Sequence, residues 1–104
     1  MKALLALTIF FFTSLVHADF ISAQKDYNNG NFEKAYKEYL TLAKFGNNKA
    51  QYNLAVMLVK GQGVEIDLIK AYAWAKASES NPEYSALTNN IEKSLSKEQL
   101  EKAQ

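Results

Sequence analysis

Apolar residues recur at helical spacing through most of the chain after residue 18. Between residues 32 and 43 they follow the spacing i, i+3, i+4, i+7, i+8 and i+11, which is typical of an amphipathic helix. Residues 19–28 have the same period. Asn29-Gly30 can form a two-residue β-hairpin turn, but its flanks lack the alternation of strands. We therefore expect a helical hairpin over residues 19–46, with Asn31 capping its second helix and Gly46 ending it.

A second hairpin is expected over residues 47–80, and its first helix is apolar on two sides. One side holds small and large aliphatic residues, Ala50, Leu54, Ala55 and Leu58. The opposite side holds Tyr52, Val56 and Val59. A narrow polar strip remains, consisting of Lys49, Asn53 and Lys60. Such a helix must lie between neighbours, as the inner helix of a stacked array does.

The turn and second helix of this hairpin repeat features of the first one. Gly61-Gln62-Gly63 is expected to reverse the chain, and Asp67 to cap the next helix. The buried stripe of that helix is expected at Leu68, Ala71, Tyr72 and Ala75, with Trp74 packing beside it. The tripeptide Lys-Ala-Tyr occurs at residues 34–36 and again at residues 70–72. An offset of 36 residues is typical of helical repeat proteins.

The last segment, residues 81–104, predicts a weaker capping hairpin. Asn81-Pro82 is a suitable start because proline is tolerated at the first helical position. Ser96 and Gln99 have the spacing of a capping box that opens a final helix over residues 97–104. That helix has few apolar residues, as the polar terminal cap of an array does.

The features of residues 50–77 resemble one unit of the Sel-1-like repeat family, a relative of the tetratricopeptide repeat. The matching positions are Ala50, Leu54, Ala55, Leu58, Gly61, Gly63, Asp67, Lys70, Ala71, Trp74 and Ala77. The resemblance extends over about residues 21 to 80. It implies an all-α fold, a short right-handed α-solenoid of about three antiparallel helix hairpins. It also implies that the protein binds other proteins and catalyses no reaction.

Residues 1–18 have the pattern of a secretory signal peptide. Lys2 precedes an apolar run over residues 3–15, and the small residue Ala18 marks the expected cleavage site. The run is shorter than the roughly 20 residues that span a bilayer. We therefore expect a bacterial protein that is periplasmic or secreted, without stable membrane insertion. Residues 19–104 are expected to form a single domain.

Composition restricts the chemistry of the remaining chain. The single histidine, His17, lies in the predicted signal peptide, and the sequence contains neither cysteine nor arginine. Metal sites built on histidine or cysteine and Ser-His or Cys-His catalysis are thus excluded. Removal of residues 1–18 leaves eleven lysines and eleven acidic residues, without the positive excess that nucleic acids require. We expect no catalytic, cofactor-binding or metal-binding residue.

An alternative function, a small secreted hydrolase of β-lactam or cell-wall substrates, is suggested by cysteine-rich relatives in the Sel-1-like family. Residues 22–25 and 94–97 both fit the S-x-x-K pattern of penicillin-recognising enzymes, but the companion S-D-N and K-T-G motifs are absent. Gly61-Gln62-Gly63 lacks the G-K-[ST] ending of a phosphate-binding loop. Both matches are better explained by chance and by turn geometry.

The expected function is therefore protein–protein interaction through the concave surface that inner helices form in such arrays. The partner is an unidentified protein or peptide. The expected partner-binding residues are Tyr27, Lys49, Tyr52, Asn53, Val56 and Lys60. Self-association is a further possibility, because the weak last hairpin is expected to leave Trp74 and Tyr84 poorly covered.

Overall fold

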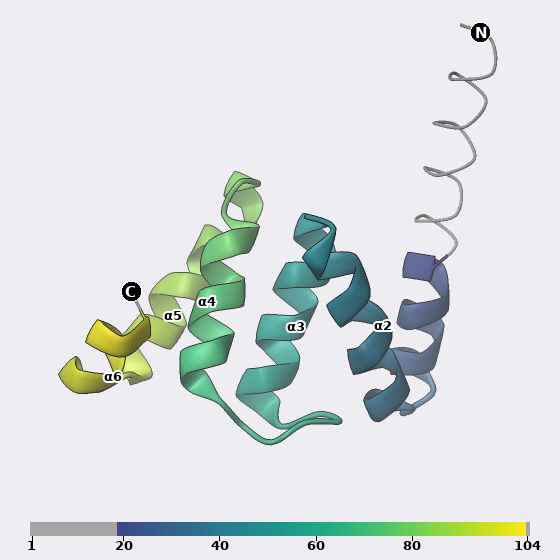
Figure 1. Cartoon of the computed structure of the whole chain (residues 1–104), viewed down its shortest axis with the longest axis horizontal. Coiled ribbons are helices and arrows are strands. Elements are labelled where there is room, and N and C mark those ends of the chain that lie inside the picture. Colours follow the sequence, from purple (N-terminus) through teal and green to yellow (C-terminus); the bar gives the residue numbers. More distant parts are fainter. Residues whose placement is uncertain (1–18, 104) are drawn as a thin grey trace, which may run out of the picture.

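The computed structural model describes residues 19–103, and these residues form helices joined by turns, without a strand among them (Figure 1). Residues 19–28 are helical. The helices that follow are α2 (Phe32–Lys44), α3 (Asn48–Lys60), α4 (Leu68–Ser78), the 3-10 turn η1 (Pro82–Tyr84), α5 (Ser85–Ser94) and α6 (Lys97–Ala103). This confirms the all-helical fold class. The predicted signal peptide, residues 1–18, lies outside the described residues.

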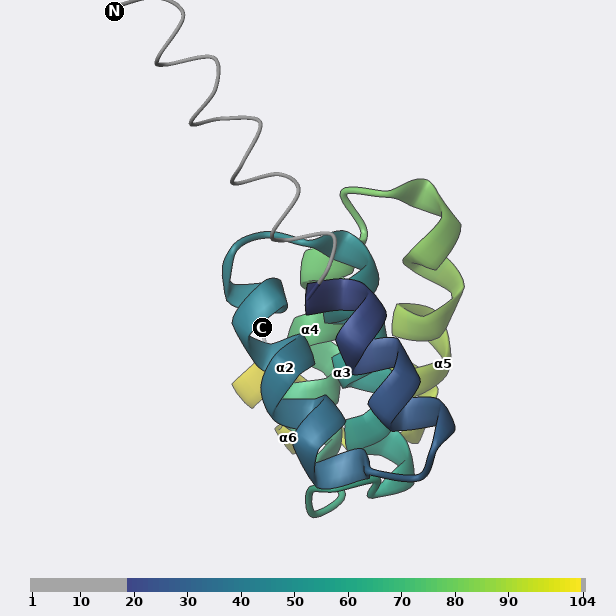
Figure 2. The same ribbon diagram turned by 90° about the vertical axis from the view of Figure 1, so that its right-hand side faces the viewer.

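Successive helices lie side by side along the long axis of the molecule (Figure 1). Helix α3 contacts both α2 and α4, and α4 in turn contacts α5 and α6. Figure 2, turned by 90°, shows helix 19–28 and α2 at the front of the array with the later helices behind them. Helix α3 thus lies between neighbours, as its two apolar sides predict.

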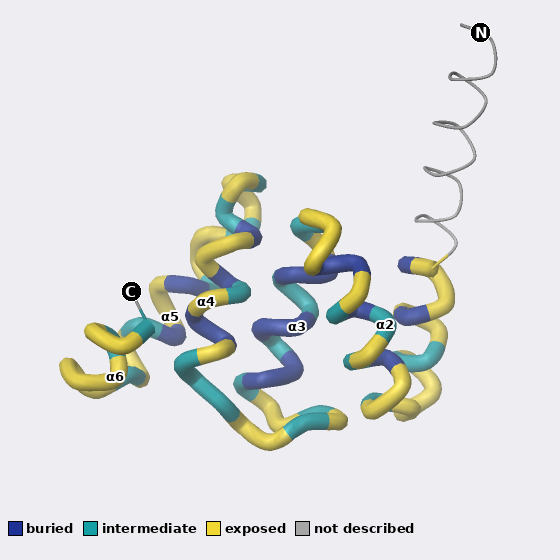
Figure 3. Tube along the Cα trace, in the orientation of Figure 1, coloured by how far each residue is buried: buried dark blue, intermediate teal, exposed yellow. Residues whose placement is uncertain are grey.

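Helix α3 belongs to two hydrophobic cores. Its residues Ala50, Leu54 and Met57 pack with helix 19–28 and α2, whereas Ala55 and Leu58 pack with α4 and α5. All five are completely buried. Buried residues accordingly concentrate in α3, while α6 is mostly exposed (Figure 3).

The faces of α3 differ in detail from those expected. Met57 and Gln51 are buried although neither was expected in the core, and Gln51 Nε2 donates a 3.1 Å hydrogen bond to the Ala43 carbonyl of α2. Tyr52 and Val56 are only half-buried. The second apolar side of α3 is therefore partly open to solvent. The completely buried residues of α3 in the two cores, which include Leu54 and Leu58, lie on its other faces.

Side-chain caps begin α3 and α4, and the cap at Asp67 was expected. Asn47 Oδ1 accepts from the Ala50 amide at 2.9 Å, and Asp67 Oδ1 accepts from the Lys70 amide at 3.0 Å. Asn31 does precede α2, but its side chain makes no capping hydrogen bond. Asn31 thus occupies the expected N-cap position of α2, but the expected capping hydrogen bond is not formed.

The glycine elbow between α3 and α4 lies against the start of α2. Gly63 has a φ of 72°, and a Cβ atom there would overlap the Phe32 carbonyl group and approach the Glu33 nitrogen to 2.6 Å. Next to it, the Tyr27 hydroxyl donates to Gln62 Oε1 at 3.0 Å. The elbow therefore also contacts helix 19–28 and the start of α2.

The C-terminal helices cover the end of the second core. Ser96 Oγ accepts from the Gln99 amide at 3.2 Å while Gln99 Oε1 accepts from the Ser96 amide at 3.0 Å, so the predicted capping box is confirmed. Trp74 is half-buried and packs against both cores. Tyr84 stacks on Tyr52 with ring centroids 4.7 Å apart. Both rings are thus partly covered within one copy of the chain.

Candidate functional site

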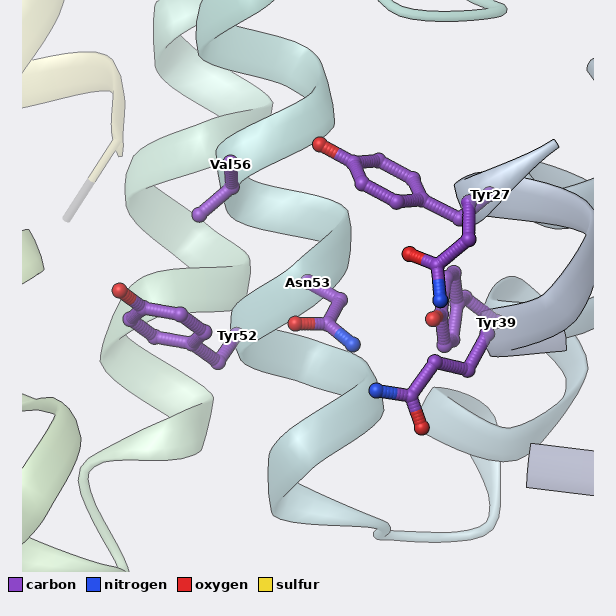
Figure 4. A pocket seen from close by; sticks show the side chains of 7 residues that line it. Tyr27, Tyr39, Tyr52, Asn53 and Val56 are labelled. Carbon is purple, nitrogen blue, oxygen red and sulfur yellow. The ribbon is translucent and has the colours of Figure 1, made fainter. Parts of the chain in front are cut away.

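A cavity of about 260 Å³ lies where helix 19–28, α2 and α3 meet. Helix 19–28 and α3 contribute three lining residues each, and α2 contributes one. The lining residues are Gln24, Tyr27, Asn28, Tyr39, Tyr52, Asn53 and Val56. In Figure 4, Asn53 projects from α3 with Tyr52 on one side and Tyr27 and Tyr39 on the other.

Helical spacing explains why these side chains share one cavity. Residues 24, 27 and 28 have the spacing i, i+3 and i+4, so they lie on one face of helix 19–28. Residues 52, 53 and 56 lie on one face of α3 in the same way. Because both helices pack against α2, these two faces border a common hollow whose lining includes Tyr39.

The polar groups of two tyrosines are already engaged. The Tyr27 hydroxyl is bonded to the elbow at Gln62, and Asn53 hydrogen-bonds the Tyr39 hydroxyl. Burial raises the pKa of Tyr39, and the Asn53 hydrogen bond partly opposes that rise. Tyr39 therefore stays neutral at physiological pH and holds Asn53 in position.

The tyrosine rings are also in contact with other rings. Tyr39 meets Phe20 edge to face at 5.7 Å, and Tyr27 meets Phe32 in the same way at 5.2 Å. Tyr52 stacks on Tyr84 of η1. Each of the three lining tyrosine rings thus packs against another aromatic ring.

The structure brings together four of the six expected partner-binding residues, namely Tyr27, Tyr52, Asn53 and Val56. Lys49 lies outside this lining, with its ammonium group 5.1 Å from the centre of the Phe20 ring. Lys60 is exposed at the end of α3 and does not line the cavity either. The polar strip expected along α3 is thus divided, and only its middle faces the cavity.

Three lining residues were missed by the sequence reasoning. Tyr27 and Asn28 follow Gln24 by three and four residues, and this helical spacing is a signal that could have identified Gln24 and Asn28. Tyr39 was expected only in the buried stripe of α2. Its ring is indeed buried, with 2% of its surface exposed, and still belongs to the lining of the cavity.

A carboxyl pair lies on another side of the contact between helix 19–28 and α2. Glu38 lies beside Asp26, and Asp26 Oδ2 is 3.6 Å from the Lys34 ammonium nitrogen. One buried oxygen of each carboxyl group has no hydrogen-bond partner among residues 19–103. Burial, followed by the bond and charge of Asp26, raises the pKa of Glu38. Asp26 favours the protonated form of Glu38, because a protonated carboxyl can donate a hydrogen bond to a neighbouring carboxylate. Asp26 does not line the cavity, and neither does Glu38.

The two serines of the S-x-x-K matches do not bond to their lysines. Ser22 Oγ donates to Glu38 Oε1 at 3.4 Å, and Ser94 Oγ donates to the Asn90 carbonyl at the same distance. Residues 19–103 also contain no group of three potential metal ligands. Among the described helices, none has the length and apolar character that crossing a bilayer requires.

Similarity to known proteins does not identify the family of this chain. Comparisons with protein-family models, with curated proteins and with solved structures each found no match. The cavity is therefore interpreted from its own residues, and membership of the Sel-1-like repeat family stays a prediction.

Proposed function

We propose that this chain is an exported, non-enzymatic interaction module that holds a partner protein or peptide in the cavity between helix 19–28 and α3. The observation that carries the proposal is the cavity lining. Amide and tyrosine side chains from three helices converge there, three of them at positions expected for partner binding, and Val56 is a fourth expected position. Sites of this kind, with an aromatic wall and a few directed polar groups, are typical of binding surfaces.

The proposed architecture is a short α-solenoid of about three hairpins, similar to Sel-1-like repeats. Helix 19–28, α3 and α5 would be its inner helices, and α2, α4 and α6 its outer helices. The 36-residue offset supports this assignment, because Ala35 and Ala71 are both completely buried and Asn31 and Asp67 both precede an outer helix. In such an array the inner helices line the concave face, where the cavity would lie.

Export is proposed from residues 1–18, whose charge and apolar run have the pattern of a signal peptide. The partner is then a periplasmic or secreted protein.

Site-specific photo-crosslinking tests the binding surface. A photoreactive phenylalanine derivative at Asn28, which is exposed and lines the cavity, is expected to give covalent adducts with the partner in the native host. The same residue at Ala73, which is exposed on α4 and does not line the cavity, is the matched control and is expected to give none.

A second change then assigns the adduct to the cavity. Val56→Lys places a long charged side chain in the cavity and should abolish the adduct at position 28, while the circular-dichroism spectrum stays helical. Equal adducts from positions 28 and 73, or adducts that persist in the Val56→Lys variant, would refute the proposal.

A further inference from the structure

From the cavity lining we infer the chemistry of the bound segment: an uncharged, extended stretch within the partner chain, held through its backbone amide groups, and not a charged side chain or a chain terminus. This inference rests on the proposed function and specifies its ligand.

The first argument is the charge of the cavity. All seven lining residues are uncharged, and burial keeps Tyr39 in its neutral form. Two charged groups of this part of the molecule are engaged elsewhere, since Lys34 lies beside Asp26 and Lys49 lies over the Phe20 ring. An ion that enters the cavity loses water without gaining a counter-charge, which is unfavourable. The cavity therefore selects against Asp, Glu, Lys, Arg and a free terminal carboxylate.

The second argument is the presence of three amide side chains. Gln24, Asn28 and Asn53 each carry a carbonyl acceptor and an NH₂ donor, which match the N–H and C=O of a peptide group. Gln24 and Asn28 are exposed, and the hydrogen bonds among residues 19–103 leave their amides without a protein partner. A partner backbone can therefore use both groups without displacing an existing hydrogen bond.

The aromatic contacts favour a peptide over a carbohydrate. Neutral sugars also bind sites with tyrosines and amides, but they need accessible ring faces for stacking. The rings of Tyr27, Tyr39 and Tyr52 already pack against Phe32, Phe20 and Tyr84, respectively. The free groups that remain are mainly amides, which suit a peptide backbone.

Selection from random peptides tests the inference without a known partner. Phage-displayed 12-residue random peptides are panned against the purified chain, and the recovered sequences are compared with the input library. We expect the recovered peptides to be depleted of charged residues over a central stretch. As synthetic peptides with blocked ends they should bind, and one central Asp or Lys should weaken binding by about tenfold or more.

A charge exchange in the cavity then locates the effect. Gln24→Glu keeps the shape of an exposed side chain and adds one negative charge to the lining. This substitution should weaken the binding of the uncharged peptides by about tenfold. In a parallel selection it should enrich peptides with a central lysine or arginine. Asn89→Asp, on the exposed side of α5 and outside the cavity, is the matched control and should leave both results unchanged.

Each other outcome overturns the inference in a recognisable way. Recovery of charged peptides whose binding is abolished by Val56→Lys would leave the proposed function standing and refute the uncharged ligand. Binding of neutral oligosaccharides in place of peptides would refute the peptide class. Recovery of no peptide, together with absence of a crosslinked adduct at position 28, would refute the proposed function itself.

Discussion

The carboxyl pair of Asp26 and Glu38 shows how a single residue makes the stability of this fold depend on pH. The pKa of Glu38 is raised in the folded chain. In the unfolded chain Glu38 loses its proton near the ordinary glutamate pKa of about 4.3, whereas in the folded chain it loses the proton at a higher pH. Because the folded state binds more protons between these two pKa values, the free energy of unfolding falls as the pH rises through that range. The contribution is most favourable below the ordinary glutamate pKa and is lost above the raised one.

Replacing the glutamate with its neutral analogue should remove this dependence. Glu38→Gln still offers a hydrogen-bond donor to Asp26 at every pH, so we expect a higher free energy of unfolding than that of the parent chain at pH 7 to 8. The difference should shrink towards pH 4. Urea unfolding across this pH range measures both values.

Glu33→Gln on the same helix is the control for this prediction. Glu33 is exposed and pairs with Lys37 at 3.9 Å, an arrangement that contributes only a few tenths of a kcal/mol. Its pH profile should therefore follow that of the parent chain. A Glu38→Gln variant that is less stable at pH 7 than the parent chain would show that Glu38 is ionised there and pairs favourably with Lys34.

The glycine elbow acts at the scale of elements, because it joins α3 to α4 and also packs against the start of α2. Gly63 combines a left-handed backbone with direct approach to the Phe32 backbone. Gly46 shares the left-handed backbone, with a φ of 88°, but a Cβ atom there would meet open space. Substitution of Gly46 therefore tests the energetic cost of the left-handed backbone alone, and substitution of Gly63 tests that cost together with the cost of a steric clash.

Alanine substitutions at these glycines should differ in effect. Gly46→Ala should lower the free energy of unfolding by about 1 to 2 kcal/mol, the cost of a left-handed alanine. Gly63→Ala adds a clash with backbone atoms that cannot move away without separating the elbow from α2, so we expect a loss of at least ~3 kcal/mol. Chemical denaturation measures both, and equal losses would contradict the close approach.

The whole molecule is most tightly held in its middle. Helix α3 contributes completely buried residues to both cores, whereas α6 contains no buried residue and only partly covers the second core with Leu100 and Ala103. Local stability follows the apolar surface that each element buries. We therefore expect stability to decrease from α3 towards the C-terminal end.

Hydrogen exchange measures this gradient. Amides of α6 should exchange at least ~100-fold faster than those in the middle of α3, because α6 can open without exposing either core fully. Ser96→Ala removes the hydroxyl of the capping box and should speed exchange in α6 while leaving α3 unchanged. Equal exchange rates in the two helices would show that the chain opens only as one unit.

Local signals were sufficient to predict the elements of this protein. Helical period, turn glycines and capping residues predicted the helix boundaries at Gly46, Asn47, Asp67 and Ser96, because caps and turns depend on residues close together in the sequence. The predicted capping hydrogen bond of Asn31 is not formed. Asparagine is a suitable capping residue, but the backbone conformation at Asn31 differs from that of a capping residue.

The sequence by itself thus determined an all-helical chain with a two-sided central helix. It also predicted a partner-binding surface, of which Tyr27, Tyr52, Asn53 and Val56 line the cavity. Only the tertiary structure decided that Gln24, Asn28 and Tyr39 join these four residues and that Lys49 and Lys60 do not. It also decided the pairing of Glu38 with Asp26. Periodicity identifies which residues share a face of one helix, whereas the meeting of faces from different helices depends on packing angles that arise from all side chains together.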